Sequence, residues 1–195
     1  MSLGCDMEKE ILYENRWMNM VKLEGWYVCT DEVRTMNNDF VFVLPYLKKV
    51  QDPAPHEYLL RVEYNPAHSE YKETSCITGQ CESGVVRYHA QMELKEEGGY
   101  TVPMKRLQYL GHCNPFKSSM AKIHMFAIEI KKTDKQHEAS GDGTAGEEGA
   151  YPIWVPRDGN EILMCKDPYV HTAIMRLDRY LRDETFRNNL STIEP

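Results

Sequence analysis

Long hydrophobic runs and paired cysteines are both missing from this sequence. No run of about 18 apolar residues and no signal-peptide core occurs, so we expect an intracellular, cytoplasmic and soluble protein with no membrane partner. The six cysteines are scattered, without a Cys-x-x-Cys pair and without a histidine at zinc-finger spacing, which argues against a zinc site. We therefore expect the cysteines to be reduced thiols.

Positive charge is also scarce. The chain has 23 Lys and Arg against 30 Asp and Glu, a net charge of −7, and a pI near 5.5. Such a surface is not built to neutralise nucleic-acid phosphates or to adhere to anionic lipid, so no nucleic-acid partner is expected. A phosphate-bearing substrate would need a cation as intermediary.

The residues that are present fit one globular domain with an added arm. Of 195 residues, 42% are hydrophobic and 27% are charged, which is enough for a sizeable core. No internal repeat is evident. Segments rich in aromatic and β-branched residues, or with alternating apolar residues, predict strands. We expect the strand that begins near residue 38 to end at Pro45. The turn-forming residues 51–56 are expected to pair it with the strand that follows them. The strand-like segments are 24–33, 38–47 with its apolar run ending at Pro45, 57–66, 106–113, 121–132 and 151–156.

The last third of the chain changes character. Residues 133–150 are rich in glycine, serine and acidic residues and predict a surface loop. From Pro168 onward, the spacing of Val170, Ile174 and Leu177 predicts an amphipathic helix over 168–187. A β-rich body with one central and one terminal helix is an α+β arrangement.

The stretch "GQCESGVVRYHAQMELKEEGGY", residues 79–100, carries three crowded glutamates. If 86–97 is helical, Glu93, Glu96 and Glu97 share one side of the helix and repel one another. A divalent cation removes this conflict, and Mg²⁺, which prefers carboxylate oxygens and bridges to phosphates, suits pyrophosphate chemistry. A solvated acidic helix end, capped by the glycine pair that follows, is the alternative interpretation.

These residues resemble the Nudix box, Gly-x5-Glu-x7-Arg-Glu-U-x-Glu-Glu-x-Gly-U with U a bulky aliphatic residue. Gly79 matches the opening glycine, and "ELKEEGGY" supplies the glutamates, Gly99 and an apolar Tyr100. The order of the strand-like segments around the box is similar to that of the ADP-ribose and nucleoside-diphosphate-sugar pyrophosphatase branch. The resemblance implies a Nudix-type α/β/α sandwich with a mixed β-sheet over 36–195 and an N-terminal β arm over 1–35.

The box departs from the family pattern in three ways. Val85 stands at the first glutamate, Met92 stands at the arginine, and one residue is missing between them. Methionine cannot hold the glutamates in place by charge-assisted hydrogen bonds. Glu82 is close enough in sequence to cap the helix in place of the lost glutamate. A one-residue change turns a helix by about 100°, so either the loop absorbs it or the carboxylates point elsewhere.

The resemblance implies Mg²⁺- or Mn²⁺-dependent hydrolysis of the pyrophosphate bond of ADP-ribose or a nucleotide sugar. The implied metal ligands are Glu93, Glu96 and Glu97 together with the carbonyl of Gly79. Glu97 also counts as catalytic, and a glutamate of the acidic loop, Glu147 or Glu148, is the implied base or outer metal ligand. A catalytically impaired Nudix domain that binds a nucleotide or a protein remains the alternative, since both the arginine and the first glutamate of the box are lost.

The resemblance also implies a homodimer whose N-terminal arm reaches across to the partner. Trp26 and Tyr27 are core residues in the plain interpretation, and base-stacking residues in the family interpretation. Cys76 and Cys81 are expected to be small packing residues, because no histidine lies beside them in the sequence.

Overall fold

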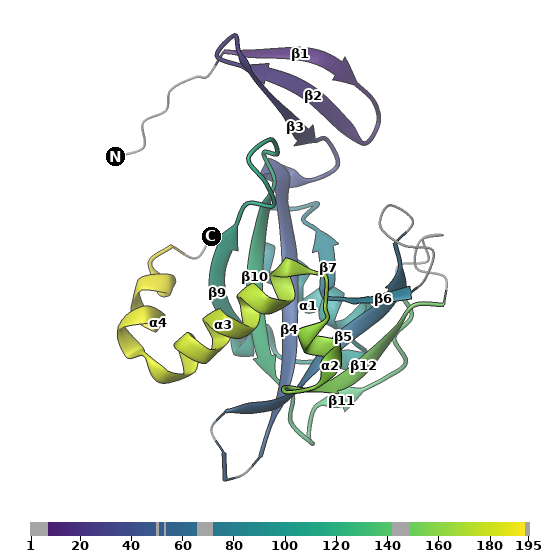
Figure 1. Ribbon diagram of the computed structural model, residues 1–195, viewed down its shortest axis with the longest axis vertical. Helices are drawn as coiled ribbons and strands as arrows, with labels where there is room; N and C mark the ends of the chain where they lie inside the picture. The colour runs from purple at the N-terminus through teal and green to yellow at the C-terminus, as the bar shows by residue number, and fades with distance from the viewer. Residues whose placement is uncertain (1–7, 50, 53, 66–71, 142–148, 194–195) are drawn as a thin grey trace.

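The computed structural model describes residues 8–49, 51–52, 54–65, 72–141 and 149–193. Two sheets and four α-helices make up most of this part of the chain (Figure 1). The strands are β1 (Lys9–Glu14), β2 (Met18–Leu23), β3 (Tyr27–Glu32), β4 (Asp39–Lys48), β5 (Pro55–Tyr64), β6 (Lys72–Ser75), β7 (Ile77–Gln80), β8 (Tyr100–Thr101), β9 (Gln108–Cys113), β10 (Lys122–Glu129), β11 (Lys135–Gln136) and β12 (Tyr151–Pro156). The α-helices are α1 (Val86–Glu96), α2 (Asn160–Leu163), α3 (Pro168–Arg182) and α4 (Glu184–Ser191), and the 3₁₀ turns are η1 (Met36–Asn38) and η2 (Met104–Arg106).

The main sheet is mixed. Its order is β12-β5-β4-β10-β9, with β6 paired to β5 and β7 paired to β4. The pairing of β10 with β4 is parallel, and the others in this sheet are antiparallel. The predicted pairing of the segments on either side of 51–56 is confirmed as β4 with β5.

Helices cover both faces of this sheet. Alternation along the strands sends Val41, Val43 and Phe126 to the face covered by α1, and sends Phe42 and Leu44 to the face covered by α3. Each set is fully buried in its own apolar cluster. The result is an α/β/α sandwich with a mixed sheet, as predicted.

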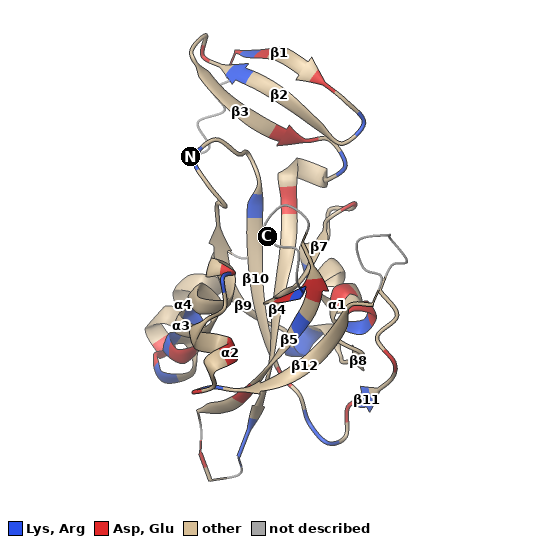
Figure 2. Cartoon of the chain, turned by 45° about the vertical axis from the view of Figure 1, so that its right-hand side comes forward, with Lys and Arg blue, Asp and Glu red and all other residues tan. Residues whose placement is uncertain are grey.

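A separate sheet, β1-β2-β3, precedes the sandwich and stands apart from it in both views (Figures 1 and 2). It is attached through β3, where Thr30 N donates to Ser118 O at 2.9 Å and Met120 N donates to Thr30 O at 2.9 Å. The Tyr27 hydroxyl also donates to the Lys117 carbonyl. The N-terminal arm is therefore a three-stranded sheet held by the loop between β9 and β10.

Two predicted boundaries were wrong. The strand expected to end at Pro45 continues to Lys48. Strand β4 pairs with β7 over Phe40–Val43 and with β5 from Tyr46, so Pro45 lies between the two pairings, where a missing N–H is tolerated. The helix expected over 168–187 is two helices, because Asp183 ends α3 and caps α4 by accepting from Phe186 N at 3.0 Å.

Candidate functional site

Helix α1 and strand β7 form the frame of the candidate site. Val86, Ala90 and Leu94 bury one stripe of α1 against the sheet, and β7 lies beside β4 with Gly79 opposite Val41. Fixing that stripe turns the glutamates at 93, 96 and 97 toward β7. The helix predicted over 86–97 is thus confirmed, with Glu97 as its C-cap residue.

A cavity of about 640 Å³ lies between these two elements. Its walls include Gly79 and all three glutamates of the predicted cluster, Glu93, Glu96 and Glu97. Arg34 also lines this cavity and brings positive charge to it. The loop between Gln80 and Val86 therefore absorbs the residue missing from the box, since the carboxylates and the glycine still share one cavity.

The absence of a side chain at Gly79 makes room for Glu93. A Cβ built at Gly79 would lie 1.8 Å from Glu93 Oε1 and 2.0 Å from its Cδ, far inside any real contact distance. The carboxylate of Glu93 thus packs directly on the backbone of β7. Any larger residue at position 79 has to displace that carboxylate.

Glu97 is the most deeply buried of the three glutamates. Its side chain is 8% exposed, forms an ion pair with Arg61 Nη1, and accepts from the backbone N–H of Thr78 at 3.0 Å. Both contacts fix the position of the carboxylate. Glu97 is a preorganised anion at one end of the cavity.

Arg61 is a site residue that sequence reasoning missed. It lies on β5, is 3% exposed, and also places Nε 3.2 Å from Glu63 Oε2. The box lacks its arginine because position 92 is Met, yet a guanidinium reaches Glu97 from a different element. The available signal was an arginine inside the apolar run Leu59-Leu60-Arg61-Val62, since a buried charge requires a partner.

The donor chemistry fits a hard divalent cation. The Gly79 carbonyl and the carboxylates of Glu93, Glu96 and Glu97 are oxygen ligands, the kind that Mg²⁺ and Mn²⁺ prefer. Within the described ranges, no group of three or more His, Cys, Asp or Glu side chains has a ready metal-holding arrangement. The chemical type of these ligands therefore suits a divalent cation. The ion pair with Arg61, however, already compensates the charge of Glu97.

The entrance of α1 differs from expectation. Its N-cap residue is Val85, and no side-chain hydrogen bond caps the helix, so the proposed capping by Glu82 was wrong. Glu82 instead lines the cavity. The turn before the helix is instead fixed by Ser83 and His89. The Ser83 N–H donates to Nε2 of His89 at 3.1 Å, and the Ser83 hydroxyl lies 2.7 Å from the same nitrogen.

The two cysteines near the box are packing residues, as expected. Burial, followed by the negative charges of Asp39 and Glu93, raises the pKa of the Cys81 thiol to about 12. Burial and the nearby Asp167 likewise raise the pKa of Cys76 well above its usual value. Both thiols are protonated at neutral pH and are not nucleophiles.

The two predicted aromatic residues, Trp26 and Tyr27, are not brought into this cavity. Trp26 is 75% exposed on the N-terminal sheet and packs edge-on against Tyr27, with ring centroids 5.4 Å apart. Neither residue lines the glutamate cavity. Glu147 and Glu148 lie outside the described residues, in the part of the acidic loop that spans 142–148.

Comparison with known proteins supports the fold. No family model matches the sequence, and no curated protein matches it. Among solved structures, the chain is similar to that of an ADP compounds hydrolase, a Nudix enzyme, with a TM-score of 0.61 and 17% sequence identity. The match covers 90% of this chain and 92% of that chain. The predicted Nudix-type α/β/α fold is therefore confirmed.

Among the described residues, none of the helices has the length and apolar character that crossing a membrane requires.

Proposed function

We propose that this protein hydrolyses the pyrophosphate bond of a nucleoside diphosphate linked to another moiety, with ADP-ribose or a nucleotide sugar as substrate. The observation that carries the proposal is the meeting of Gly79, Glu93, Glu96 and Glu97 in one cavity of about 640 Å³. A volume of this size suits a nucleotide-sized ligand. The similar fold of an ADP compounds hydrolase adds support.

The residues of the chain have separate parts in this proposal. Mg²⁺ or Mn²⁺, held by Glu93, Glu96, Glu97 and the Gly79 carbonyl, would neutralise charge on the phosphate oxygens. Arg61 holds the Glu97 carboxylate in place. We assign the removal of a proton from the attacking water to Glu147 or Glu148 of the acidic loop.

We assign Arg34, which lines the cavity, a part in positioning the substrate. It is an exposed cation, and its guanidinium lies 4.6 Å from the centre of the Trp17 ring. This contact holds a positive charge on the cavity wall, where it can face a substrate phosphate. Arg34 thus adds a cation to the cavity wall besides Arg61, which pairs with Glu97.

A binding module without hydrolysis is the second candidate. The observation in its favour is the ion pair between Arg61 and Glu97, which removes part of the negative charge that a metal ion requires. Val85 and Met92 in the box point the same way.

Product analysis separates the two candidates. The purified protein is incubated with ADP-ribose and a panel of nucleotide sugars in Mg²⁺ or Mn²⁺. Hydrolysis gives two phosphomonoesters, AMP and ribose 5-phosphate in the case of ADP-ribose, and we expect both in equal amounts. Tight binding of the same compounds without any product would exclude hydrolysis and support the binding module.

Metal binding should raise the melting temperature of the wild type. At a metal concentration of about 100 Kd, a ligand specific to the native state stabilises it by about 2.7 kcal/mol, a shift of roughly 5–10 °C for a chain of this size. Scanning calorimetry should show this shift in the wild type and in Glu161→Gln, an exposed control on α2. Glu93→Gln should lack it. Equal shifts in all three proteins would remove Glu93 from the metal site.

We further propose that the protein is a homodimer joined through the β1–β3 sheet. Every residue of the edge strand β1 is exposed, including Ile11, Leu12 and Tyr13 at 45–58%. A free apolar edge strand is a template for pairing with another chain. In such a dimer, Trp26 and Tyr27 could reach the cavity of the partner subunit and stack on a base.

Substitutions on β1 test the dimer. Light scattering at micromolar concentration should give twice the chain mass of 22.7 kDa for the wild type. Ile11→Lys/Tyr13→Lys should run as a monomer, because two charges on the edge strand oppose pairing. The control Leu163→Lys/Met175→Lys changes two exposed apolar residues outside this sheet and should remain dimeric. A monomeric wild type would contradict the proposal.

A further inference from the structure

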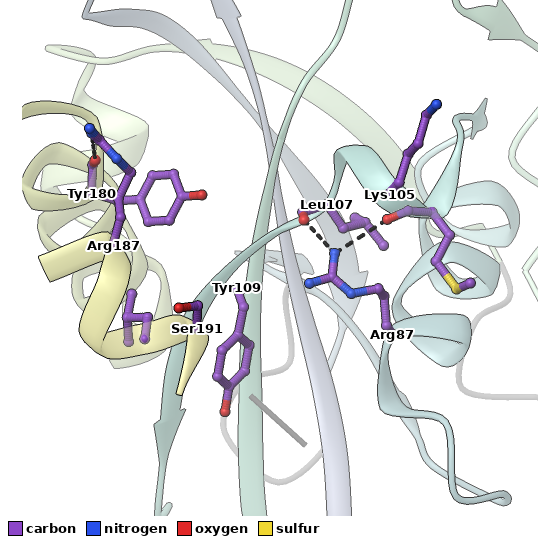
Figure 3. A pocket seen from close by; sticks show the side chains of 9 residues that line it. Arg87, Lys105, Leu107, Tyr109, Tyr180, Arg187 and Ser191 are labelled. Atoms are coloured by element: carbon purple, nitrogen blue, oxygen red, sulfur yellow. Dashed lines mark hydrogen bonds between the residues drawn. The ribbon is translucent and has the colours of Figure 1, made fainter. Parts of the chain in front are cut away.

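A second cavity lies at the free edge of the main sheet, beside strand β9. It has a volume of about 480 Å³ and is bounded by the first turns of α1, by η2, and by α3 and α4 (Figure 3). Arg87, Lys105 and Arg187 contribute side chains to its walls. No Asp or Glu appears among the described residues that line it. In a chain of net charge −7, this concentration of positive charge requires an explanation.

Arg87 is held in position on one wall. Its Nη1 donates to Leu107 O at 2.5 Å and to Met104 O at 3.3 Å, and the guanidinium lies 5.5 Å from the centre of the Phe126 ring. The carbonyl oxygens and the aromatic face fix the orientation of this guanidinium. Lys105 is exposed on the same wall, and both side chains are visible there in Figure 3.

The opposite wall carries a second oriented arginine and an aromatic ring. Arg187 donates from Nη1 to Tyr180 O at 2.7 Å, and its guanidinium lies 5.9 Å from the centre of the Tyr180 ring. Figure 3 shows the Tyr180 ring and hydroxyl directed from the helices toward the opening. Ser191 adds a hydroxyl group between the walls, whereas the hydroxyl of Tyr109 lies 3.2 Å from Nδ1 of the buried His124. The cavity therefore combines fixed cations, hydroxyl groups and an aromatic surface.

We propose that this cavity is a binding site for a small phosphate-bearing anion. Guanidinium forks match phosphate oxygens, a lysine adds a point charge, and hydroxyl groups supply further hydrogen bonds. The volume lies in the range of small-molecule sites. A nucleic acid is a poorer fit, because the positive charge is confined to one concavity of an acidic chain.

The site is separate from the glutamate cavity. The two cavities share no lining residue among those the structure describes, although α1 contributes Arg87 to one and Glu93 to the other. The anion site needs no divalent metal, since its charge comes from side chains. It can therefore be tested whether or not the protein is a hydrolase.

Calorimetric titration in the presence of EDTA tests the proposal, with inorganic pyrophosphate and AMP as probes. The full-length wild type should bind at least one probe saturably, and more weakly as salt is raised. Lys105→Glu should raise Kd by at least about tenfold, because it reverses a charge on the cavity wall. The control Lys132→Glu reverses an exposed lysine elsewhere and should bind like the wild type, as should Glu93→Gln.

The two probes distinguish the source of the phosphate. Tighter binding of pyrophosphate identifies an inorganic phosphate site, whereas tighter binding of AMP identifies a nucleotide site that uses the aromatic ring, and both results support the proposal. It is overturned if neither probe binds saturably at millimolar concentration, if Lys132→Glu weakens binding as much as Lys105→Glu, or if Glu93→Gln abolishes binding. Binding of single-stranded RNA in the absence of binding to either small probe would also overturn it.

Discussion

Arg61→Met should lower the free energy of unfolding by about 3–5 kcal/mol, the usual cost of removing one partner from a buried ion pair. Arg61 is 3% exposed and pairs with both Glu97 and Glu63. Methionine fills most of the volume but removes the guanidinium that pairs with the buried Glu97 carboxylate. The uncompensated charge, rather than a packing defect, is then the source of the loss.

Urea unfolding of wild type and variant measures this effect, and Arg157→Met is the matched control. Arg157 forms a 3.0 Å ion pair with Asp178 but its side chain is 39% exposed, so its loss should cost at most about 1 kcal/mol. The double variant Arg61→Met/Glu97→Met should recover most of the stability, because no unpaired charge remains on Glu97. A loss below about 1 kcal/mol for Arg61→Met, with no recovery in the double variant, would show that this pair does not hold the site together.

Gly79→Ala should reduce kcat/KM for the best substrate by about 100-fold or more, a loss typical of misplacing one electrostatic group at a reacting centre. The added methyl group would occupy the position of the Glu93 carboxylate, with a Cβ to Oε1 distance of 1.8 Å. The carboxylate is the end of a flexible side chain, so it can swing away while the fold survives. Activity should therefore fall much further than stability.

Gly84→Ala is the control for this substitution. A Cβ at Gly84 meets only Met36, at 3.6 Å, which is an ordinary contact. Its kcat/KM and its urea midpoint should both match those of the wild type. If Gly79→Ala retains full activity, the contact between Gly79 and Glu93 has no part in the reaction.

Much of this arrangement could be predicted from local sequence. The spacing of Glu93, Glu96 and Glu97 on a helix fixed which side of α1 they share, and alternating apolar residues located the central strands. The course of β4 past Pro45 could not be predicted, because it depends on where β7 and β5 meet its edge. Residue patterns report local periodicity, whereas strand pairing is set by distant segments.

The compensation for Met92 is the clearest example of this limit. Sequence spacing locates an arginine only where the box places it, but the guanidinium that reaches Glu97 comes from Arg61 on β5, 36 positions earlier in the numbering. Restoring the arginine as Met92→Arg should therefore change turnover little, since the charge of Glu97 is already paired. The loss of a motif residue does not by itself show the loss of its interaction.

Hydrolysis of ADP-ribose in ¹⁸O-labelled water tests the central proposal most directly. Mass spectrometry of the products should find one ¹⁸O atom in either AMP or ribose 5-phosphate, formed by the wild type and by Glu161→Gln only when Mg²⁺ or Mn²⁺ is present. Glu93→Gln should form neither product above background. Unlabelled products, products formed equally by Glu93→Gln, or the absence of products from every protein with each metal would contradict the proposal that the glutamate cavity hydrolyses a pyrophosphate bond.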